Sequence, residues 1–192
     1  MKIINKKNAI RLLKNGLPLL FSTDTLPAIG CLPEYSELIY KIKKREKNKA
    51  LILMGSEISQ ILDYVHISAR NDFKDIAEKY WPGPLTMVIP INQKKKLKIG
   101  ASNNTLGIRI PNSLMARSLI SETGPLATSS ANISGMPSKT TAQQVSINFP
   151  FLNLLGPVPW ENCSGQASTI IAWSSKGKWE LIREGHLVIE GI

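Results

Sequence analysis

The segment 41–49 is strongly basic, because six of its nine residues are Lys or Arg. Lys43 and Arg45 are two positions apart, and side chains at that spacing do not share a face of a helix. They act together only if a helix ends here and the chain then extends, as Asn48 and the apolar run from Ala50 indicate. Such a cluster would neutralise a polyphosphate, as phosphoryl and nucleotidyl transfer require. The competing interpretation is a solvated, basic helix end.

Two segments rich in hydroxyl groups follow apolar runs. Thr23 and Thr25 lie in the segment 22–31, just past a predicted strand, where they could orient a small polar substrate. The segment 125–135 carries four hydroxyls and one amide within residues 128–134, and such groups can donate to phosphate without a P-loop. Taken alone, the first segment is better interpreted as an ordinary turn, and a plain polar loop competes equally for the second.

The C-terminal third adds a further cation. Arg183 ends a predicted strand, where it could bind a phosphate or a carboxylate. A surface salt bridge is the commoner role for such an arginine. Ser168 opens the strand before it.

The common nucleotide and metal motifs are absent from the sequence. No two glycines are five apart, as a P-loop needs, or two apart, as the dinucleotide fingerprint needs. No serine lies in a Gly-x-Ser-x-Gly elbow. The two cysteines form no CxxC pair and the two histidines are isolated, so we expect no metal site in the protein. ATP would therefore be bound by basic and hydroxyl side chains on loops at strand ends.

Alternating strands and helices indicate an α/β layered domain. We expect a single domain over residues 1–192, with no linker and no repeat. The segment 23–33 is predicted to be a loop because it is rich in Thr, Pro and Gly. Strands are predicted at 17–21, 50–54, 85–91, 105–110, 125–128, 152–155, 168–172 and 179–183. Helices are predicted at 8–15, 35–43, within 56–80, at 113–121 and from 141.

The net charge of +10 favours an anionic partner, such as a nucleotide or a nucleic acid. A lysine-rich proteome would explain the charge equally well. No apolar run approaches the roughly 18 residues that span a bilayer. The basic N-terminus leads into an amphipathic segment rather than a signal-peptide core, so we expect a cytoplasmic protein with no membrane partner.

In this order and spacing, the segments resemble the YrdC-like family of threonylcarbamoyl-AMP synthases over nearly the whole chain. The family's threonine-rich loop is similar to 23–30, and its Lys-x-Arg and following Lys match Lys43, Arg45 and Lys49. The remaining matches are Tyr80-Trp-Pro-Gly-Pro-Leu-Thr, Gly107-Ile-Arg-Ile-Pro, Ser130-Ala-Asn132-Ile-Ser-Gly, Ser168-Thr and Arg183-Glu-Gly.

The resemblance implies a twisted, mainly mixed sheet flanked by helices, with a basic concave face. It implies an enzyme that joins L-threonine, bicarbonate and ATP into threonylcarbamoyl-adenylate and pyrophosphate for tRNA modification. Mg²⁺ would enter with ATP. Weak electrostatic binding of RNA or tRNA, and proteins that later transfer the threonylcarbamoyl group to tRNA, are further implied partners. The implied roles are catalysis and phosphate binding for Lys43 and Arg45, threonine binding for Thr23 and Arg109, and ATP binding also for Lys49, Ser130, Asn132, Ser168 and Arg183.

The chain departs from the family pattern at the threonine loop. Pro27 stands where the family has an aromatic residue that walls the threonine pocket, and Ala28 stands where it has Gly. Two alternatives therefore stay open. One is a non-catalytic paralogue that binds RNA or nucleotide, and the other is a carbamoyl-adenylate enzyme that serves a different acceptor.

Overall fold

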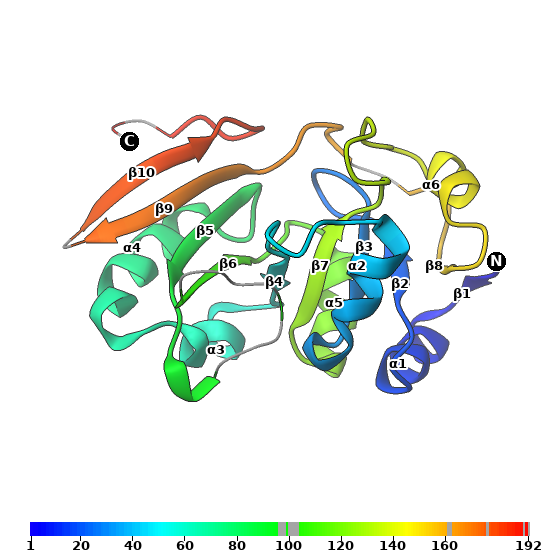
Figure 1. The fold of residues 1–192 in the computed structure, drawn as a ribbon, viewed down its shortest axis with the longest axis horizontal. Helices are drawn as coiled ribbons and strands as arrows, with labels where there is room; N and C mark the ends of the chain where they lie inside the picture. Colours follow the sequence, from blue (N-terminus) through cyan, green and yellow to red (C-terminus); the bar gives the residue numbers. More distant parts are fainter. Residues whose placement is uncertain (96–98, 100–103, 161–162, 176, 190, 192) are drawn as a thin grey trace.

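In the computed structural model, one mixed sheet runs through the molecule and helices cover both of its faces (Figure 1). The structure describes all residues except 96–98, 100–103, 161–162, 176, 190 and 192. Within the described residues the sheet has ten strands, in the order β1-β8-β2-β3-β7-β4-β6-β5-β9-β10. Four neighbouring pairs are parallel and five are antiparallel. The predicted fold class is confirmed.

The element bounds agree with most of the predicted segments. The strands are β1 (Ile3–Ile4), β2 (Leu19–Phe21), β3 (Ala28–Cys31), β4 (Ile52–Met54), β5 (Leu85–Pro90), β6 (Thr105–Arg109), β7 (Leu126–Ser130), β8 (Asn153–Leu155), β9 (Thr169–Ser175) and β10 (Lys178–Arg183). The α-helices are α1 (Lys6–Lys14), α2 (Glu37–Lys43), α3 (Ile58–Ile61), α4 (Arg70–Tyr80), α5 (Leu114–Thr123) and α6 (Ala142–Asn148). Short 3₁₀ turns cover Pro33–Tyr35, Leu62–Tyr64, Ile67–Ala69 and Gln93–Lys95. No helix among the described residues is long and apolar enough to cross a membrane.

Two hydrophobic layers hold helices against the sheet. Successive side chains of a strand point to opposite faces, so Leu19 and Phe21 of β2 face one layer and Leu20 faces the other. The first layer contains buried residues of α1 and α5, and the second contains those of α2, α3 and α4. Leu126 of β7 belongs to the first layer and Ala127 to the second. The sheet is thus buried on both faces near its centre.

The prediction of a loop over 23–33 is wrong for its second half. Residues Ala28–Cys31 form β3, which is fully buried and pairs antiparallel with β2 and β7. Gly30 permits the close pairing of β3 with β2, because a Cβ at this position would lie 2.8 Å from the Phe21 ring. The close packing of β2 and β3 therefore makes this segment a strand, and the strand propensity of its own residues is not the cause. The two-residue strand β1 was also not predicted.

Several loops and strand ends meet where functional groups are expected. The loop after β2, the chain between α2 and β4, and the ends of β6, β7 and β10 all contribute to one cavity. The Trp-Pro-Gly-Pro turn after α4 is held by Trp81, whose Nε1 donates to the Leu85 carbonyl at 2.7 Å. This turn places the Gly83 carbonyl beside Arg109.

Candidate active site

A cavity of about 190 Å³ opens where these segments converge. Its lining comes from parts of the chain that are far apart in sequence, which is typical of a binding site on an α/β sheet. Six of the nine residues predicted from the sequence are among those that line it: Thr23, Arg45, Arg109, Ser130, Ser168 and Arg183.

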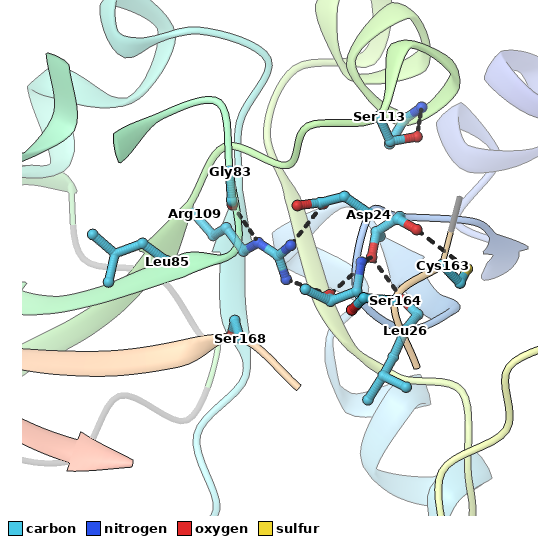
Figure 2. Close-up of polar contacts among 12 residues, drawn as sticks. Asp24, Leu26, Gly83, Leu85, Arg109, Ser113, Cys163, Ser164 and Ser168 are labelled. Carbon is cyan, nitrogen blue, oxygen red and sulfur yellow. Dashed lines mark hydrogen bonds and ion pairs between the residues drawn. The ribbon is translucent and has the colours of Figure 1, made fainter. Parts of the chain in front are cut away.

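Arg109 is fixed at one end of this cavity by three different acceptors (Figure 2). Its Nη2 donates to Asp24 Oδ1 at 2.7 Å, its Nη1 to Thr25 Oγ1 at 2.7 Å, and its Nε to the Gly83 carbonyl at 3.1 Å. The side chain is 5% exposed. Burial lowers the pKa of Arg109 from its ordinary value, and the Asp24 charge opposes that shift. The guanidinium is therefore held in one orientation, and one hydrogen on each Nη has no acceptor among the described residues.

The hydroxyl of Thr23 shapes the loop that carries Asp24. Thr23 Oγ1 donates to the Leu26 carbonyl at 2.7 Å and accepts from the Thr25 backbone N–H at 3.2 Å. The two threonine hydroxyls lie 3.1 Å apart. This segment is therefore both a turn and part of the candidate site, because the turn orients Thr25 and Asp24 toward Arg109.

Arg45 and Arg183 line the cavity, and neither has a carboxylate partner among the described residues. Arg45 donates to the carbonyls of Lys49 and Ala50 at 2.9 and 2.8 Å, and Arg183 donates to the Ser168 carbonyl. No described residue accepts a hydrogen bond from Nη1 of either arginine. Burial lowers the pKa of both guanidiniums from its ordinary value, although arginine stays charged in proteins. A bound anion would offset the cost of burying these two charges.

Hydroxyl and apolar groups complete the lining. Ser168 Oγ lies 2.8 Å from Thr86 Oγ1, which sets its orientation. Leu26, Ala28 and Met54 form part of the apolar wall. Pro27 lies between two lining residues but is not itself one of them. The structure thus assigns the wall at this loop to the neighbours of Pro27.

Three predicted residues do not line the cavity. Lys43 is 1% exposed, and its Nζ binds Ser129 Oγ at 2.7 Å and the Ser130 carbonyl. Lys49 is exposed and pairs with Glu46 at 3.4 Å. Asn132 accepts a hydrogen bond from Ser130 Oγ through its Oδ1 at 2.6 Å. Lys43 and Asn132 both contact the lining residue Ser130, whereas the Lys49 carbonyl accepts from the lining residue Arg45 and its side chain pairs with Glu46.

Sequence reasoning missed three groups of this site. Asp24 was not singled out, although an acidic residue between two threonines is the only carboxylate close to Arg109 in the described structure. Thr25 was noted only as a loop hydroxyl. Ser138 lines the cavity from a polar segment that carries no sequence signal.

The charge of the described lining is suited to an anionic ligand. Its described lining includes three guanidiniums and no Asp or Glu. No group of three or more His, Cys, Asp or Glu residues that could hold a metal ion occurs in the described residues. The groups present can position a ligand and stabilise negative charge, which is what nucleotidyl transfer needs.

Comparison with known proteins identifies the family. The family model Sua5_yciO_yrdC, described as "Telomere recombination", matches residues 11–185. The chain belongs to the Sua5/YciO/YrdC family. A threonylcarbamoyl-AMP synthase of Vibrio vulnificus is 30% identical over 150 residues, which are 74% of this chain and 80% of the relative. The enzyme of that name from Bacillus subtilis is 33% identical over 143 residues, but these are 72% of this chain and 41% of the relative.

Solved structures of the family share the fold. Sua5 of P. abyssi complexed with L-threonine has a TM-score of 0.86 and is 26% identical, covering 96% of this chain. The chain spans 58% of that protein's length. The E. coli YciO structure, at 19% identity and a TM-score of 0.78, supports the fold alone.

Proposed function

We propose that this protein is an L-threonylcarbamoyladenylate synthase, a nucleotidyltransferase that uses L-threonine, bicarbonate and ATP. The observation that supports the proposal is that one cavity contains cationic groups in two different environments. Arg109 is held rigidly by Asp24 and Thr25, whereas no described carboxylate pairs with Arg45 or Arg183. The first arrangement suits the carboxylate of an amino acid, and the second suits phosphates.

The reaction proceeds in two steps. The amine of threonine adds to CO₂ derived from bicarbonate and loses a proton, which gives a carbamate. A carbamate oxygen then attacks the α-phosphorus of ATP, and the bond to the β,γ-bridged pyrophosphate breaks. Both steps are accelerated mainly by holding the reactants together and by stabilising the charge on the phosphates.

Six lining residues have a proposed part in this chemistry. Arg109 binds the threonine carboxylate, and Thr23 maintains the loop that shapes this end of the cavity. Arg45 and Arg183 bind phosphate oxygens, and Ser130 and Ser168 bind the nucleotide. Mg²⁺ enters as the ATP complex, with phosphate oxygens and water as its ligands, since the described lining offers no carboxylate.

The proposed partners follow from the product. The adenylate would be consumed by proteins that transfer the threonylcarbamoyl group to tRNA in the cytoplasm. The charge of +10 would support weak, electrostatic contact with tRNA. The basic runs 41–49 and 94–98 are the segments we expect to make this contact, and residues 96–98 of the second run lie outside the described residues.

Pyrophosphate release tests the proposal. Purified protein is mixed with ATP, Mg²⁺, bicarbonate and one amino acid at a time, and each component is omitted in turn. We expect release only when threonine and bicarbonate are both present. Release with a different amino acid would favour an enzyme for another acceptor. Normal ATP binding without release for any amino acid would favour the non-catalytic paralogue.

A further inference from the structure

We propose that Lys43 is a positioning residue: it supports the nucleotide-binding end of β7 from the opposite face of the sheet and makes no contact with phosphate. The inference deepens the proposed function, because it assigns a role at the same site. It rests on the geometry of α2 and β7.

The register of β7 decides on which side of the sheet the Lys43 amine lies. Directly paired residues of neighbouring strands point their side chains to the same face. Ser129 pairs with Ile29, whose side chain belongs to the layer of α2. Ser130 pairs with Ala28, which belongs to the layer of α1 and α5 and also lines the cavity. Lys43 binds the Ser129 hydroxyl and therefore approaches β7 from the α2 side. Ser129 itself lines the cavity, whereas the buried Lys43 does not.

Three contacts join the end of α2 to the end of β7 and the segment that follows it. Lys43 Nζ donates to Ser129 Oγ and to the Ser130 carbonyl, and the Lys43 carbonyl accepts from the Ser134 backbone N–H at 3.1 Å. The Ser130 carbonyl also accepts from the Asn132 backbone N–H at 2.9 Å. The amine thus holds the turn that orients the Ser130 hydroxyl.

The contact between the Lys43 amine and the Ser130 carbonyl is buried in the protein. The side chain has no access to water, so nothing replaces the amine if it is removed, and the Ser130 carbonyl loses a buried donor. Desolvation, with a smaller contribution from the Arg45 charge, lowers the pKa of Lys43 to about 7. An amine that is partly neutral near pH 7 is better suited to hydrogen bonding within the protein than to neutralising phosphate.

The test compares Lys43, a buried residue outside the lining, with Arg45, which lines the cavity. Lys43→Met removes the amine at similar side-chain length, Ser129→Ala removes its hydroxyl partner, which is itself a lining residue, and Arg45→Met removes a cation within the lining. Affinity for a non-hydrolysable ATP analogue is measured by calorimetry without threonine, and kcat and KM for ATP are measured by pyrophosphate release. Circular dichroism and urea unfolding establish that each variant is folded.

We expect Lys43→Met and Ser129→Ala each to weaken analogue binding by about tenfold and to change kcat by less than about threefold. The double variant should be no weaker than Lys43→Met alone, because both changes break one contact. Arg45→Met should lower kcat strongly. Loss of kcat in Lys43→Met equal to that in Arg45→Met, or unchanged analogue binding in Ser129→Ala, would overturn the proposal. Because calorimetry needs no turnover, absence of threonine-dependent release would refute the proposed function and leave this test intact.

Discussion

Replacing Asp24 by Ala should destabilise the protein far more than the loss of an ordinary ion pair. The Nη2 of Arg109 lies 2.7 Å from Asp24 Oδ1, and the two side chains are 5% and 12% exposed. Water therefore cannot replace the carboxylate, and the guanidinium keeps its charge. Breaking a buried pair on one side costs about 3–5 kcal/mol. Thr25 and Gly83 still accept from the guanidinium, so we expect about 3 kcal/mol, at the lower end of that range.

The chain offers a matched control at its surface. Lys6 and Glu122 also lie 2.7 Å apart, but their side chains are 47% and 51% exposed. Glu122→Ala should therefore cost about 1 kcal/mol or less. Urea unfolding measures the loss of stability in each variant from the shift in midpoint at unchanged slope. The loss in Asp24→Asn, whose amide oxygen can still accept a hydrogen bond, should lie between those of Asp24→Ala and Glu122→Ala. Equal costs for Asp24→Ala and Glu122→Ala would refute the view that burial gives this ion pair its importance.

Four further predictions concern the site and its charges. Arg45→Ala should abolish pyrophosphate release in a folded protein, because a charge-assisted phosphate contact is worth about 2–4 kcal/mol; near-normal turnover would remove Arg45 from the site. The free energy of unfolding should rise by up to about 1.4 kcal/mol per pH unit above pH 7. The reason is that native Lys43 titrates near 7 and unfolded Lys43 near 10.5, so the unfolded chain holds the extra proton in this interval. Urea unfolding across pH should show this rise lost in Lys43→Met, and equal slopes would contradict it. RNA binding should weaken steeply with added salt in a filter-binding assay, whereas a salt-insensitive, sequence-specific interaction would exclude an electrostatic mode. Pro27→Tyr should leave the ratio of threonine to serine turnover unchanged, since Pro27 does not line the cavity, and an altered ratio would place it in the wall.

Most of the fold could be predicted because apolar runs mark strands and helix ends carry clear signals. The strand β7 was predicted from its apolar start, and it continues through Ser129 and Ser130 into the polar segment. The strand β3 was missed because it is short and lies in a segment rich in Thr, Pro and Gly, a composition that predicts a loop. Its pairing with β2 and β7 is a tertiary effect that no local pattern contains.

The site could be predicted as a set of residues but not as an arrangement. The sequence indicates that Lys43 and Arg45 lie at the end of a helix, and α2 does end at Lys43, with Lys44 in the left-handed conformation. The sequence cannot indicate that the Lys43 side chain is buried against β7 while the Arg45 side chain lines the cavity. These positions depend on the register of distant strands. The pairing of Asp24 with Arg109 across 85 residues is hidden for the same reason.

Direct identification of the product tests the central claim. The protein is incubated with ATP, Mg²⁺, threonine and ¹³C-bicarbonate, and the small molecules are separated at once and analysed by mass spectrometry. We expect a threonylcarbamoyl-adenylate that carries one ¹³C atom, formed together with pyrophosphate and absent when either threonine or bicarbonate is omitted. Pyrophosphate release without a labelled adenylate, or an adenylate that lacks the ¹³C atom, would contradict the account.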